Sequence, residues 1–330
     1  MKKVLVTGGN GRLGNVLVRQ LLEDQHQVEV LLAPHHQDKK PLEGLEVQYR
    51  VGDVRDRAAL APAIAGKEWV FHLAAKIWLH PDKDKSTEMI NREGARLVAE
   101  LCLESGVERL IHCSSHHALS MEPQDQPVDE NNALALDEVV TYHRTKAEGE
   151  VAVLEQVKKG LDAVIVNPGS IIGPHDYAPS LFVQALSDFY NGKIPFLMEG
   201  MTDYADVRDI SRAIIQAAHK GRTGERYLLT GWMVDMKDLP ALVEKVSGKK
   251  MPKRILPLWL MYTLLPLIQL GSRVSGKPAL FTRDMLKAAQ SNPVISHEKA
   301  RKELNYQPRS LEDTFKATLD WCRQMNWIKD

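Results

Sequence analysis

The stretch VLVTGGNGRLGNVLVRQLL at residues 4–22 decides the fold of this chain. Its first three residues are apolar and short enough for a buried strand, and its second half repeats apolar residues at helical spacing. A turn with four glycines joins the two halves. Strand, glycine-rich turn and helix in this order begin a βαβ unit, which belongs to a parallel sheet.

The glycines of this turn follow the G-x-x-G-x-x-G spacing. Glycine permits a tight turn, close approach of the backbone to a pyrophosphate, and close packing of helix on strand. The free N–H groups at the start of the helix then attract the anion. An ordinary turn would also use glycine, but this strand–turn–helix context favours a dinucleotide. We expect it to be bound by Gly8, Gly11, Arg12, Leu13 and Gly14.

Outward from this unit, strand-like and helix-like segments alternate to about residue 170. The expected strands are short, continuous apolar runs, which are typical of strands buried on both faces. They lie at 28–32, 47–51, 69–73, 109–113 and 163–166, and helices are expected at 86–105 and 140–158. This alternation predicts an α/β fold of the Rossmann type, a doubly wound parallel sheet with helices on both faces.

The pattern changes after residue 170, where prolines separate shorter elements. A helix at 208–219 and a strand at 226–229 are expected to return to the sheet. Further helices are expected at 236–247, 259–270, 281–290 and 310–326. We therefore expect an NAD(P)-binding Rossmann domain and a smaller, mostly helical C-terminal lobe that binds the substrate. The domain comprises 1–170 with about 206–230, and the lobe comprises about 171–205 with 231–330.

The composition excludes several kinds of partner. In 330 residues, 43 Lys and Arg are balanced by 43 Asp and Glu, so the chain lacks the basic surplus that neutralises nucleic-acid phosphates. The three cysteines lack Cys-x-x-Cys spacing and the histidines lack ligand spacing, so we expect no disulfide and no metal site. Only three apolar residues follow Met1-Lys2-Lys3, too few for a signal peptide, and a cytoplasmic location is expected.

The end of the second strand indicates which dinucleotide binds. An acid there accepts a hydrogen bond from the ribose of NAD, whereas a basic residue accommodates the 2′-phosphate of NADP. This chain reads Leu32-Ala33-Pro34-His35-His36, and its nearby cations favour NADP, while NAD remains open. After the third and fourth strands, Asp53 and Val54 suit the adenine, and Ala74 is small enough for a closely passing backbone. A helix cap near Asp56 is the competing role for an acid here.

A tyrosine and a lysine four residues apart, Tyr142 and Lys146, share one face of the helix expected at 140–158. A phenol is a poor base at neutral pH, because lowering its pKa by roughly 3 units requires about 4 kcal/mol of phenolate stabilisation. A neighbouring ammonium group supplies such stabilisation. Ser114 and Ser115 follow a strand at the edge where α/β sheets bind ligands, and they suit a carbonyl oxygen. A solvated helix face and a turn cap are the alternatives.

In this order, the segments resemble the extended short-chain dehydrogenases/reductases over nearly the whole chain. The resemblance rests on TGGNGRLG at 7–14, GDVRD at 52–56, FHLAA at 71–75, NREG at 91–94, CSS at 113–115, YHRTK at 142–146, NPGSIIGP at 167–174 and DVRD at 206–209. It implies a catalytic triad in which Ser115 polarises the carbonyl, Tyr142 is the general acid/base, and Lys146 lowers its pKa and holds the nicotinamide ribose. It also implies that Asn91 and Pro168 lie close to the cofactor.

The segment NPGSIIGP departs from the pattern of nucleotide-sugar enzymes in this family, which commonly read R-P-x-N-x-Y-G-P. Ser170 and Ile172 replace the sugar-contacting Asn and the Tyr, and Thr202 stands where those enzymes often carry an Arg. A pocket without these polar groups discriminates poorly for a hydroxyl-rich ligand. The segment is closer to the dihydroflavonol 4-reductase and 3β-hydroxysteroid dehydrogenase-like branch.

The resemblance implies an NAD(P)-dependent oxidoreductase that interconverts a carbonyl and a secondary or primary alcohol on a fairly apolar small molecule. A nucleotide-sugar epimerase or dehydratase with the same triad is the alternative, and a non-catalytic NADP-binding redox sensor is a second. Substrate contacts are expected from His116, Trp78 and Ser170. The pair His116–His117 would contact substrate or relay a proton near neutral pH, and a solvent-facing role is the alternative.

The run ILPLWLMYTLLPLIQL at 255–270 is nearly all apolar, but it is shorter than the roughly 20 residues that span a bilayer. No transmembrane segment is therefore expected. Three roles stay open for this run: core of the small lobe, a membrane contact, or part of an apolar substrate pocket with Ile77, Trp78, Phe182 and Trp232.

Apolar residues lie on one side of the helices expected at 86–105 and 140–158, among them Ile90, Leu97, Leu101, Val151 and Leu154. Such a stripe packs either against the sheet or against a second copy of the chain. A homodimer and a monomer both remain open.

Overall fold

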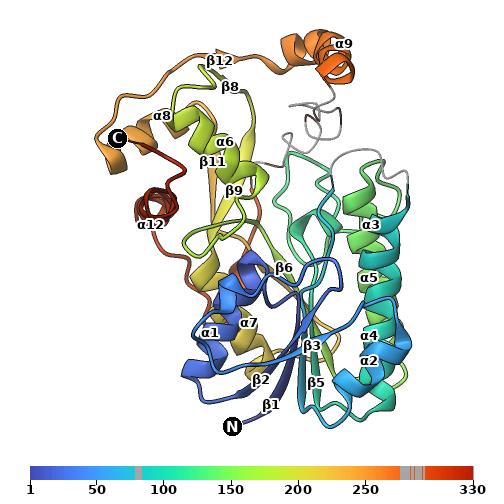
Figure 1. Ribbon diagram of the computed structural model, residues 1–330. Coiled ribbons are helices and arrows are strands. Elements are labelled where there is room, and N and C mark those ends of the chain that lie inside the picture. Colours follow the sequence, from blue (N-terminus) through green and yellow to red (C-terminus); the bar gives the residue numbers. More distant parts are fainter. Residues whose placement is uncertain (79–83, 276–282, 284–285, 287–291, 293, 330) are drawn as a thin grey trace.

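The computed structural model of the protein describes residues 1–78, 84–275, 283, 286, 292 and 294–329. Its central sheet has seven parallel strands in the order β3-β2-β1-β4-β5-β6-β10 (Figure 1). These are β1 (Lys3–Thr7), β2 (Gln27–Leu32), β3 (Gln48–Val51), β4 (Trp69–His72), β5 (Arg109–Cys113), β6 (Ala163–Pro168) and β10 (Arg226–Leu229). The predicted Rossmann-type sheet is confirmed, including the late strand that returns to it.

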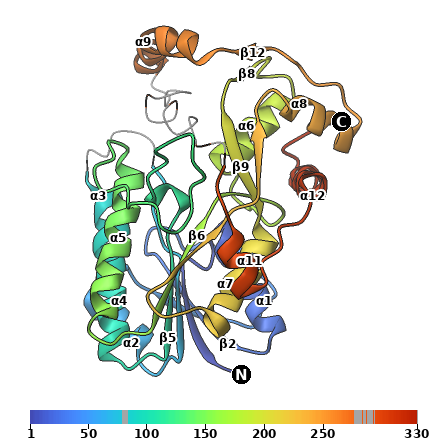
Figure 2. The same cartoon turned by 180° about the vertical axis from the view of Figure 1, so that it is seen from behind.

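Helices cover both faces of the sheet, because alternate residues of each strand point to opposite sides. In β1, Val4 and Val6 pack into one core, and Leu5 between them packs into the other. The first face carries α1 (Arg12–Glu23), α7 (Val207–Lys220) and α11 (Glu298–Leu304), and the second carries α2 (Arg57–Ile64), α4 (Gly94–Glu104) and α5 (Thr141–Val157). Figures 1 and 2 show the two helical layers on either side of the sheet.

The starts of these helices differ in a way that matters for binding. The Asp56 carboxylate caps α2 by accepting a hydrogen bond from the Ala58 N–H (2.9 Å), and Asp206 caps α7 in the same manner. Helix α1 begins after Gly11 with no side-chain cap. Since the first N–H groups of a helix have no partner within it, those of α1 remain available to a ligand.

The helix expected at 86–105 is interrupted. It consists of α3 (Ser86–Glu88), a π-helical turn (Met89–Glu93) and α4. A π-helical turn inserts one extra residue and is often found at functional sites. The apolar spacing of the sequence predicts one continuous helix because a single inserted residue barely disturbs it.

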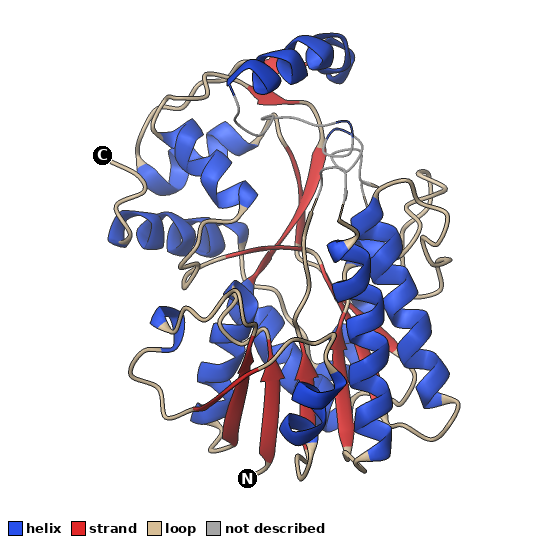
Figure 3. Ribbon diagram, turned by 45° about the vertical axis from the view of Figure 1, so that its right-hand side comes forward, coloured by secondary structure: helices blue, strands red, loops and turns tan. Residues whose placement is uncertain are grey.

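The smaller lobe combines helices with a second sheet (Figure 3). The helices α6 (Leu181–Tyr190), α8 (Leu239–Ser247) and α12 (Leu311–Gln324) pack on β7 (Ser170–Ile172), β9 (Met201–Asp206) and β11 (Trp232–Asp235). The expected helices at 236–247 and 310–326 are present as α8 and α12. The sequence does not predict this sheet, because its strands are too short for a clear alternating pattern.

The lobe ends in a strand pair, β8 (Leu197–Met198) and β12 (Ile255–Leu256), and in helix α9 (Leu258–Ser275). Met261 and Leu265 of α9 are buried against this strand pair. Part of the apolar run at 255–270 therefore forms a small core of its own. Within the described ranges, no helix is long and apolar enough to cross a membrane.

Two further predictions concern helices. The helix expected at 281–290 lies almost entirely outside the described residues. In the helices of the second face, Leu97 and Leu101 are buried in the core beneath the sheet. This part of the apolar stripe faces the interior of the chain, so it offers no argument for a dimer.

Candidate active site

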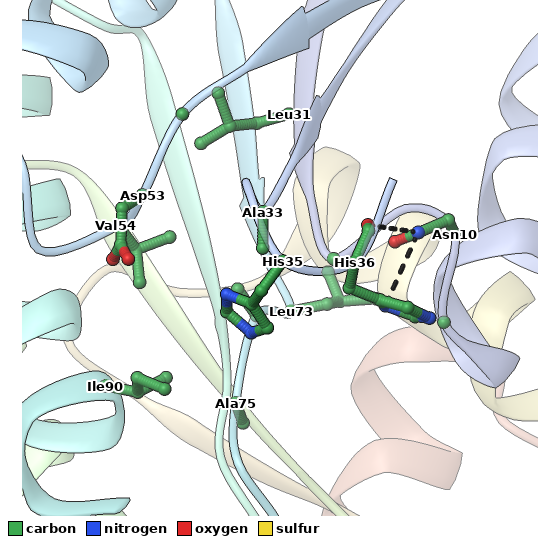
Figure 4. A pocket seen from close by; sticks show the side chains of 14 residues that line it. Asn10, Leu31, Ala33, His35, His36, Asp53, Val54, Leu73, Ala75 and Ile90 are labelled. Atoms are coloured by element: carbon green, nitrogen blue, oxygen red, sulfur yellow. Dashed lines mark hydrogen bonds between the residues drawn. The ribbon is translucent and has the colours of Figure 1, made fainter. Parts of the chain in front are cut away.

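A pocket opens where the strand order of the sheet reverses, beside the carboxyl ends of β1 and β4. Ligands of open α/β sheets bind in this crevice. The pocket has a volume of about 260 Å³, and its walls come from the glycine turn, from the ends of β2 and β3, and from the segment after β4 (Figure 4). The predicted cofactor residues that line it are Gly8, Gly11, Asp53, Val54 and Ala74.

The three glycines of the G-x-x-G-x-x-G spacing serve different purposes. Gly8 has a φ of +70°, and a Cβ there would lie 2.9 Å from the Ala74 N atom. A Cβ on Gly14 would lie 2.1 Å from the carbonyl O of Gly8. A Cβ on Gly11 would lie 3.2 Å from the same carbonyl O, which is a tight contact but a looser one than those at Gly8 and Gly14. Because Gly11 lines the pocket, its missing side chain fits a ligand that approaches the uncapped start of α1.

The side chains of Arg12 and Leu13 point away from the pocket. Leu13 packs in the core on the α1 face of the sheet. Arg12 donates to the carbonyl O of Ile171, and its Nε lies 3.5 Å from the Asp176 carboxylate in the small lobe. Any contact that these two residues make with a pyrophosphate therefore comes from their main-chain N–H groups, and the Arg12 guanidinium instead ties α1 to the lobe.

Asp53 and Val54 form the wall at the end of β3. Arg55 holds the Asp53 carboxylate with two side-chain hydrogen bonds (2.9 and 2.6 Å), which lower the pKa of that carboxyl. Asp53 thus presents an ionised acceptor to the pocket. Since the helix cap of this segment is Asp56, Asp53 is left for the ligand.

The loop after β2 is fixed by a side chain of the glycine turn. Asn10 is buried, and its Nδ2 donates to the carbonyl O of His36 (3.0 Å; Figure 4) and to the carbonyl O of Asp38 (3.1 Å). This holds Ala33 at the position of the ribose-binding acid, and His35 on the pocket wall. The importance of Asn10 does not follow from local patterns, because both of its partners lie on another loop.

Ser115, Tyr142 and Lys146 meet at the same edge of the sheet, from the end of β5 and the start of α5. Burial raises the pKa of Tyr142 to about 12, and a side-chain hydrogen bond with Ser115 acts in the opposite direction. Lys146 is buried, its pKa is lowered by burial, and its Nζ donates to the carbonyl O of Cys113 (2.6 Å). The protein by itself therefore holds Tyr142 as the neutral phenol.

Ser115 is held at both of its ends. Its Oγ accepts a hydrogen bond from the His117 N–H (3.2 Å), and its carbonyl O accepts one from Nδ2 of Asn167 (2.9 Å). Ser115 thereby caps the short turn His116–Ala118, as the alternative for one of the serines predicts. Because Oγ accepts in this contact, the hydroxyl hydrogen can be donated to Tyr142 or to a substrate oxygen.

A buried carboxylate supports the triad from the next turn of α5. Glu150 is fully buried, its Oε1 accepts from Nδ2 of Asn167 (2.6 Å), and its Oε2 lies 3.2 Å from Nε of Arg226. Since Asn167 also holds the carbonyl O of Ser115, this network sets the position of the serine. Glu150 is not among the residues predicted from the sequence, although it continues the four-residue spacing of Tyr142 and Lys146 along α5, which could have indicated it.

Three histidines stack beside the serine. The ring centroids of His116 and His117 are 3.9 Å apart, and those of His117 and His143 are 4.3 Å apart. Nδ1 of His116 lies 3.0 Å from the carbonyl O of Pro168, so Nδ1 carries the hydrogen and Nε2 is an acceptor. Burial lowers the pKa of His116 to about 4, which leaves the imidazole neutral. A proton relay near neutral pH is therefore not supported for His116.

Asn91, expected near the cofactor, has three partners within the protein. Its Oδ1 accepts from the Lys76 N–H (2.8 Å), and its Nδ2 donates to the Lys76 carbonyl O (3.1 Å) and to Oγ1 of Thr145 (3.2 Å). The neighbouring Ile90, rather than Asn91, lines the pocket. Asn91 braces the chain after β4 against α5.

The residues expected to contact substrate lie on separate segments. Trp78 follows β4 and is 39% exposed, with Nζ of Lys76 5.1 Å from its ring centroid. Ser170 begins β7, just beyond the end of β6 at Pro168. Both segments leave the carboxyl ends of the main strands, the edge at which the triad lies.

One of the three roles left open for 255–270 groups this run with Ile77, Trp78, Phe182 and Trp232 in an apolar pocket. Phe182 packs inside the core of the small lobe, where its ring centroid lies 4.6 Å from that of Tyr204. Trp232 is 47% exposed, and its Nε1 donates to the carbonyl O of Arg309 (2.8 Å). The Phe182 contact is with the core of the small lobe, and the Trp232 indole is held by the Arg309 main chain, so neither contact supports grouping these two residues with 255–270.

A Rossmann-type sheet, an uncapped glycine turn at its switch point and a neighbouring Ser–Tyr–Lys group together define a nicotinamide-dinucleotide enzyme. The chain belongs to the NAD dependent epimerase/dehydratase family, whose model matches residues 4–229. It is an NAD-dependent enzyme of oxidoreductase type, as the resemblance implies.

Known proteins are similar over nearly the whole chain. The sterol demethylase protein B of Methylococcus capsulatus is 30% identical over 98% of this chain and 99% of its own length. The mouse sterol-4-alpha-carboxylate 3-dehydrogenase, decarboxylating, is 28% identical over 93% of this chain and 87% of its own. The crystal structure of gox2253 has a TM-score of 0.87 and 31% identity, and each chain covers 100% of the other.

Proposed function

We propose that the protein is an NAD(P)-dependent dehydrogenase or reductase that interconverts a ketone and a secondary alcohol on an apolar ring system such as a sterol. The observation that carries this proposal is the convergence of Ser115, Tyr142 and Lys146 at the sheet edge beside the dinucleotide pocket. Two relatives whose names refer to sterols support the substrate class.

Exposed apolar side chains near this edge also support an apolar substrate. Ile77 follows β4, Met89 lies in the π-helical turn, and Val139 comes shortly before α5; they are 59%, 41% and 71% exposed. Covering such side chains with an apolar ligand contributes roughly 25 cal/mol per Å² of buried apolar surface. A hydroxyl-rich sugar offers no comparable gain.

The proton chemistry follows from the three side chains. Bound NAD(P) supplies or accepts the hydride. In reduction, Ser115 donates a hydrogen bond to the carbonyl oxygen, and Tyr142 transfers its phenolic proton to that oxygen as the carbon receives the hydride. The products are the alcohol, the oxidised cofactor and a phenolate, which the charge of Lys146 stabilises. Because burial raises the pKa of Tyr142 to about 12, the phenol carries at neutral pH the proton that reduction of a carbonyl requires.

The loop after β2 supports a preference for NADP. Ala33 offers no carboxylate to a ribose hydroxyl, and the imidazoles of His35 and His36 line the pocket beside it. An acidic residue there would repel a 2′-phosphate, whereas imidazoles can donate hydrogen bonds to it.

Cofactor titration followed by a turnover assay tests the proposal. We expect the protein fluorescence to report tighter binding of NADPH than of NADH. With NADPH, a steroid 3-ketone should be reduced, and the Tyr142→Phe variant should bind NADPH normally but turn over at least about 10²-fold more slowly. Tyr177→Phe, which removes a phenol from the other lobe, serves as the matched control.

Other results would contradict the proposal. Conversion of UDP-glucose without net consumption of cofactor would identify an epimerase. Tight NADPH binding without turnover of any steroid or alicyclic ketone would indicate a redox sensor. An undiminished rate for Tyr142→Phe would remove the assigned proton donor.

A further inference from the structure

Helix α9 presents an apolar face that packs against nothing in the described part of the chain. Its inner side buries Met261 and Leu265, which are 1% and 7% exposed. On the outer side, Trp259, Thr263 and Pro266 are exposed, and they follow the helical spacing of one stripe. Trp259 is 68% exposed, so most of a large apolar indole ring is in contact with solvent.

The sequence around this face is basic, although two carboxylates border it: Glu199 accepts a hydrogen bond from the Leu258 N–H (3.2 Å), and Glu244 lies beside Lys253. Residues 245–275 contain six Lys and Arg and no Asp or Glu, in a chain whose formal net charge is zero. The remainder of the chain consequently carries an excess of six acidic residues. Positive charge is thus concentrated around the most apolar segment of the protein.

Several of these cations are exposed ahead of the helix. Lys250 and Arg254 are exposed, and Lys253 is 71% exposed, with Nζ 3.4 Å from the Glu244 carboxylate. This basic segment leads through β12 directly into α9. The segment and the helix therefore form one continuous basic and apolar stretch of surface.

The place of α9 in the fold leaves this surface accessible. The helix lies at the end of the small lobe that is farthest from the N-terminus, at the upper edge of Figure 1 and again of Figure 2. It has 18 residues and a length of about 27 Å, and Pro266 interrupts its hydrogen bonding. The hydrocarbon core of a bilayer is about 30 Å thick, so α9 is suited to lie on a membrane and not to cross it.

We propose that α9 and the basic segment Lys249–Arg254 dock the protein on the surface of an anionic phospholipid bilayer. The cations are attracted to the negative headgroups, and Trp259 enters the interfacial region with the apolar stripe. A helix that served only as core would not require neighbouring cations. A basic loop that served only to face solvent would not require an exposed tryptophan beside it. Docking on an anionic membrane explains why both occur together. This proposal does not depend on the reaction proposed above.

Vesicle flotation tests the docking without any substrate. We expect the protein to float with vesicles of phosphatidylcholine and phosphatidylglycerol. With vesicles of phosphatidylcholine alone, we expect it to remain in the bottom fraction. Added salt should weaken the binding, since it screens exposed charges. Replacing Lys250 and Arg254 by Gln should weaken it about five-fold for each lost cation, and Trp259→Ser should weaken it about ten-fold.

Matched controls separate docking from misfolding. Trp232→Ser removes another exposed tryptophan, and Lys302→Gln removes an exposed cation of α11; both should bind vesicles as the unchanged protein does. NADPH titration of each variant verifies that the Rossmann sheet is intact. If the unchanged protein does not bind NADPH, that result would contradict the proposed reaction but not the proposed docking.

Three results would overturn the docking proposal. The first is no flotation with the anionic vesicles. The second is flotation that Trp259→Ser and the charge variants leave unchanged. The third is concentration-dependent self-association in sedimentation that Trp259→Ser abolishes, because it would show that a second copy of the chain covers this face.

Discussion

Asp203 of β9 is a buried residue at which protonation and folding are linked. It is 2% exposed, its Oδ1 accepts a hydrogen bond from the Gly231 N–H (2.9 Å), and its Oδ2 has no hydrogen-bond partner among the described residues. Burial raises the pKa of Asp203 to about 7. The folded protein thus favours the neutral acid, whereas the unfolded chain ionises near pH 4. Asp203 therefore contributes most to the free energy of unfolding below about pH 4, where it is neutral in both states. This contribution is lost as the pH rises through about 7, because the buried carboxyl must then ionise.

We therefore predict that Asp203→Asn removes a pH dependence of stability. The unchanged protein should lose up to about 4 kcal/mol relative to this variant between about pH 4 and pH 8, because a shift of about 3 units corresponds to that free energy. Urea unfolding at several pH values measures the difference. Asp137→Asn, at an exposed acid, is the control. Parallel curves for Asp203→Asn and the unchanged protein would show that Asp203 does not titrate in this range.

Single residues also show what local patterns can reveal about the candidate site. The spacing of Tyr142 and Lys146 on one helix, and the position of Ser115 after a strand, suffice to expect them at one edge of the sheet. The direction of the Arg12 side chain does not follow from its place in the glycine turn, because its partners Ile171 and Asp176 are about 160 residues away along the chain.

At the scale of elements, the glycine turn combines two constraints that the sequence does not distinguish. Gly14 is required by the contact between α1 and the carbonyl O of Gly8, and Gly8 by its positive φ. Gly11 is required by neither. The G-x-x-G-x-x-G spacing therefore does not distinguish Gly8 and Gly14, which the fold requires, from Gly11, which we expect the ligand to require.

Alanine substitutions should separate these requirements. Gly14→Ala should destabilise the protein by about 1–3 kcal/mol, because its Cβ overlaps the main chain. Gly11→Ala should cost less than about 1 kcal/mol as a change of helix cap, yet it should weaken NADPH binding more than ten-fold. Thermal unfolding and fluorescence titration measure the two effects. Equal cofactor affinity for Gly11→Ala and the unchanged protein would refute a ligand role for this glycine.

Other elements show the limit of periodicity. Hydrophobic spacing predicts α1, α7 and α12 well, because each packs one apolar stripe on a large core. The buried side of α5 is instead largely polar, and it includes Lys146 and Glu150. Hydrophobic spacing misses the π-helical turn after α3 and all three strands of the second sheet. These elements owe their form to side-chain contacts with distant segments, such as the hydrogen bonds between Asn91 and the main chain of Lys76.

At the scale of the whole molecule, the chain passes between the main sheet and the lobe several times, and ion pairs tie the two parts together. Arg309, which precedes α12, donates to the Asp209 carboxylate of α7 through Nε (3.0 Å) and Nη2 (2.6 Å). The neighbouring Asp206 is almost fully buried, with an oxygen 3.7 Å from Nε of Arg309. The C-terminal helix is thereby anchored to the Rossmann sheet.

We predict that Arg309→Met loosens this anchor. Its loss removes the charge-assisted hydrogen bonds that Nε and Nη2 donate to Asp209, and we expect a destabilisation of roughly 2 kcal/mol, between the values of exposed and buried ion pairs. Arg301→Met, at an exposed pair with Glu298, should change the stability by less than about 1 kcal/mol. Urea unfolding compares them, and equal losses for the two variants would contradict an anchoring role.

The amino-acid sequence was sufficient to predict the class of fold, the position of the glycine turn, and the serine, tyrosine and lysine that we propose to react. These properties are encoded in residues that are close along the chain: apolar runs, the glycine spacing, and the tyrosine and lysine one helical turn apart. Only the tertiary structure decided that Glu150 and Arg226 support the serine through Asn167, that His116 is neutral, and that Phe182 belongs to the core of the lobe. The physical reason is that burial and long-range contacts set charge states and side-chain directions, and neither is written in local spacing.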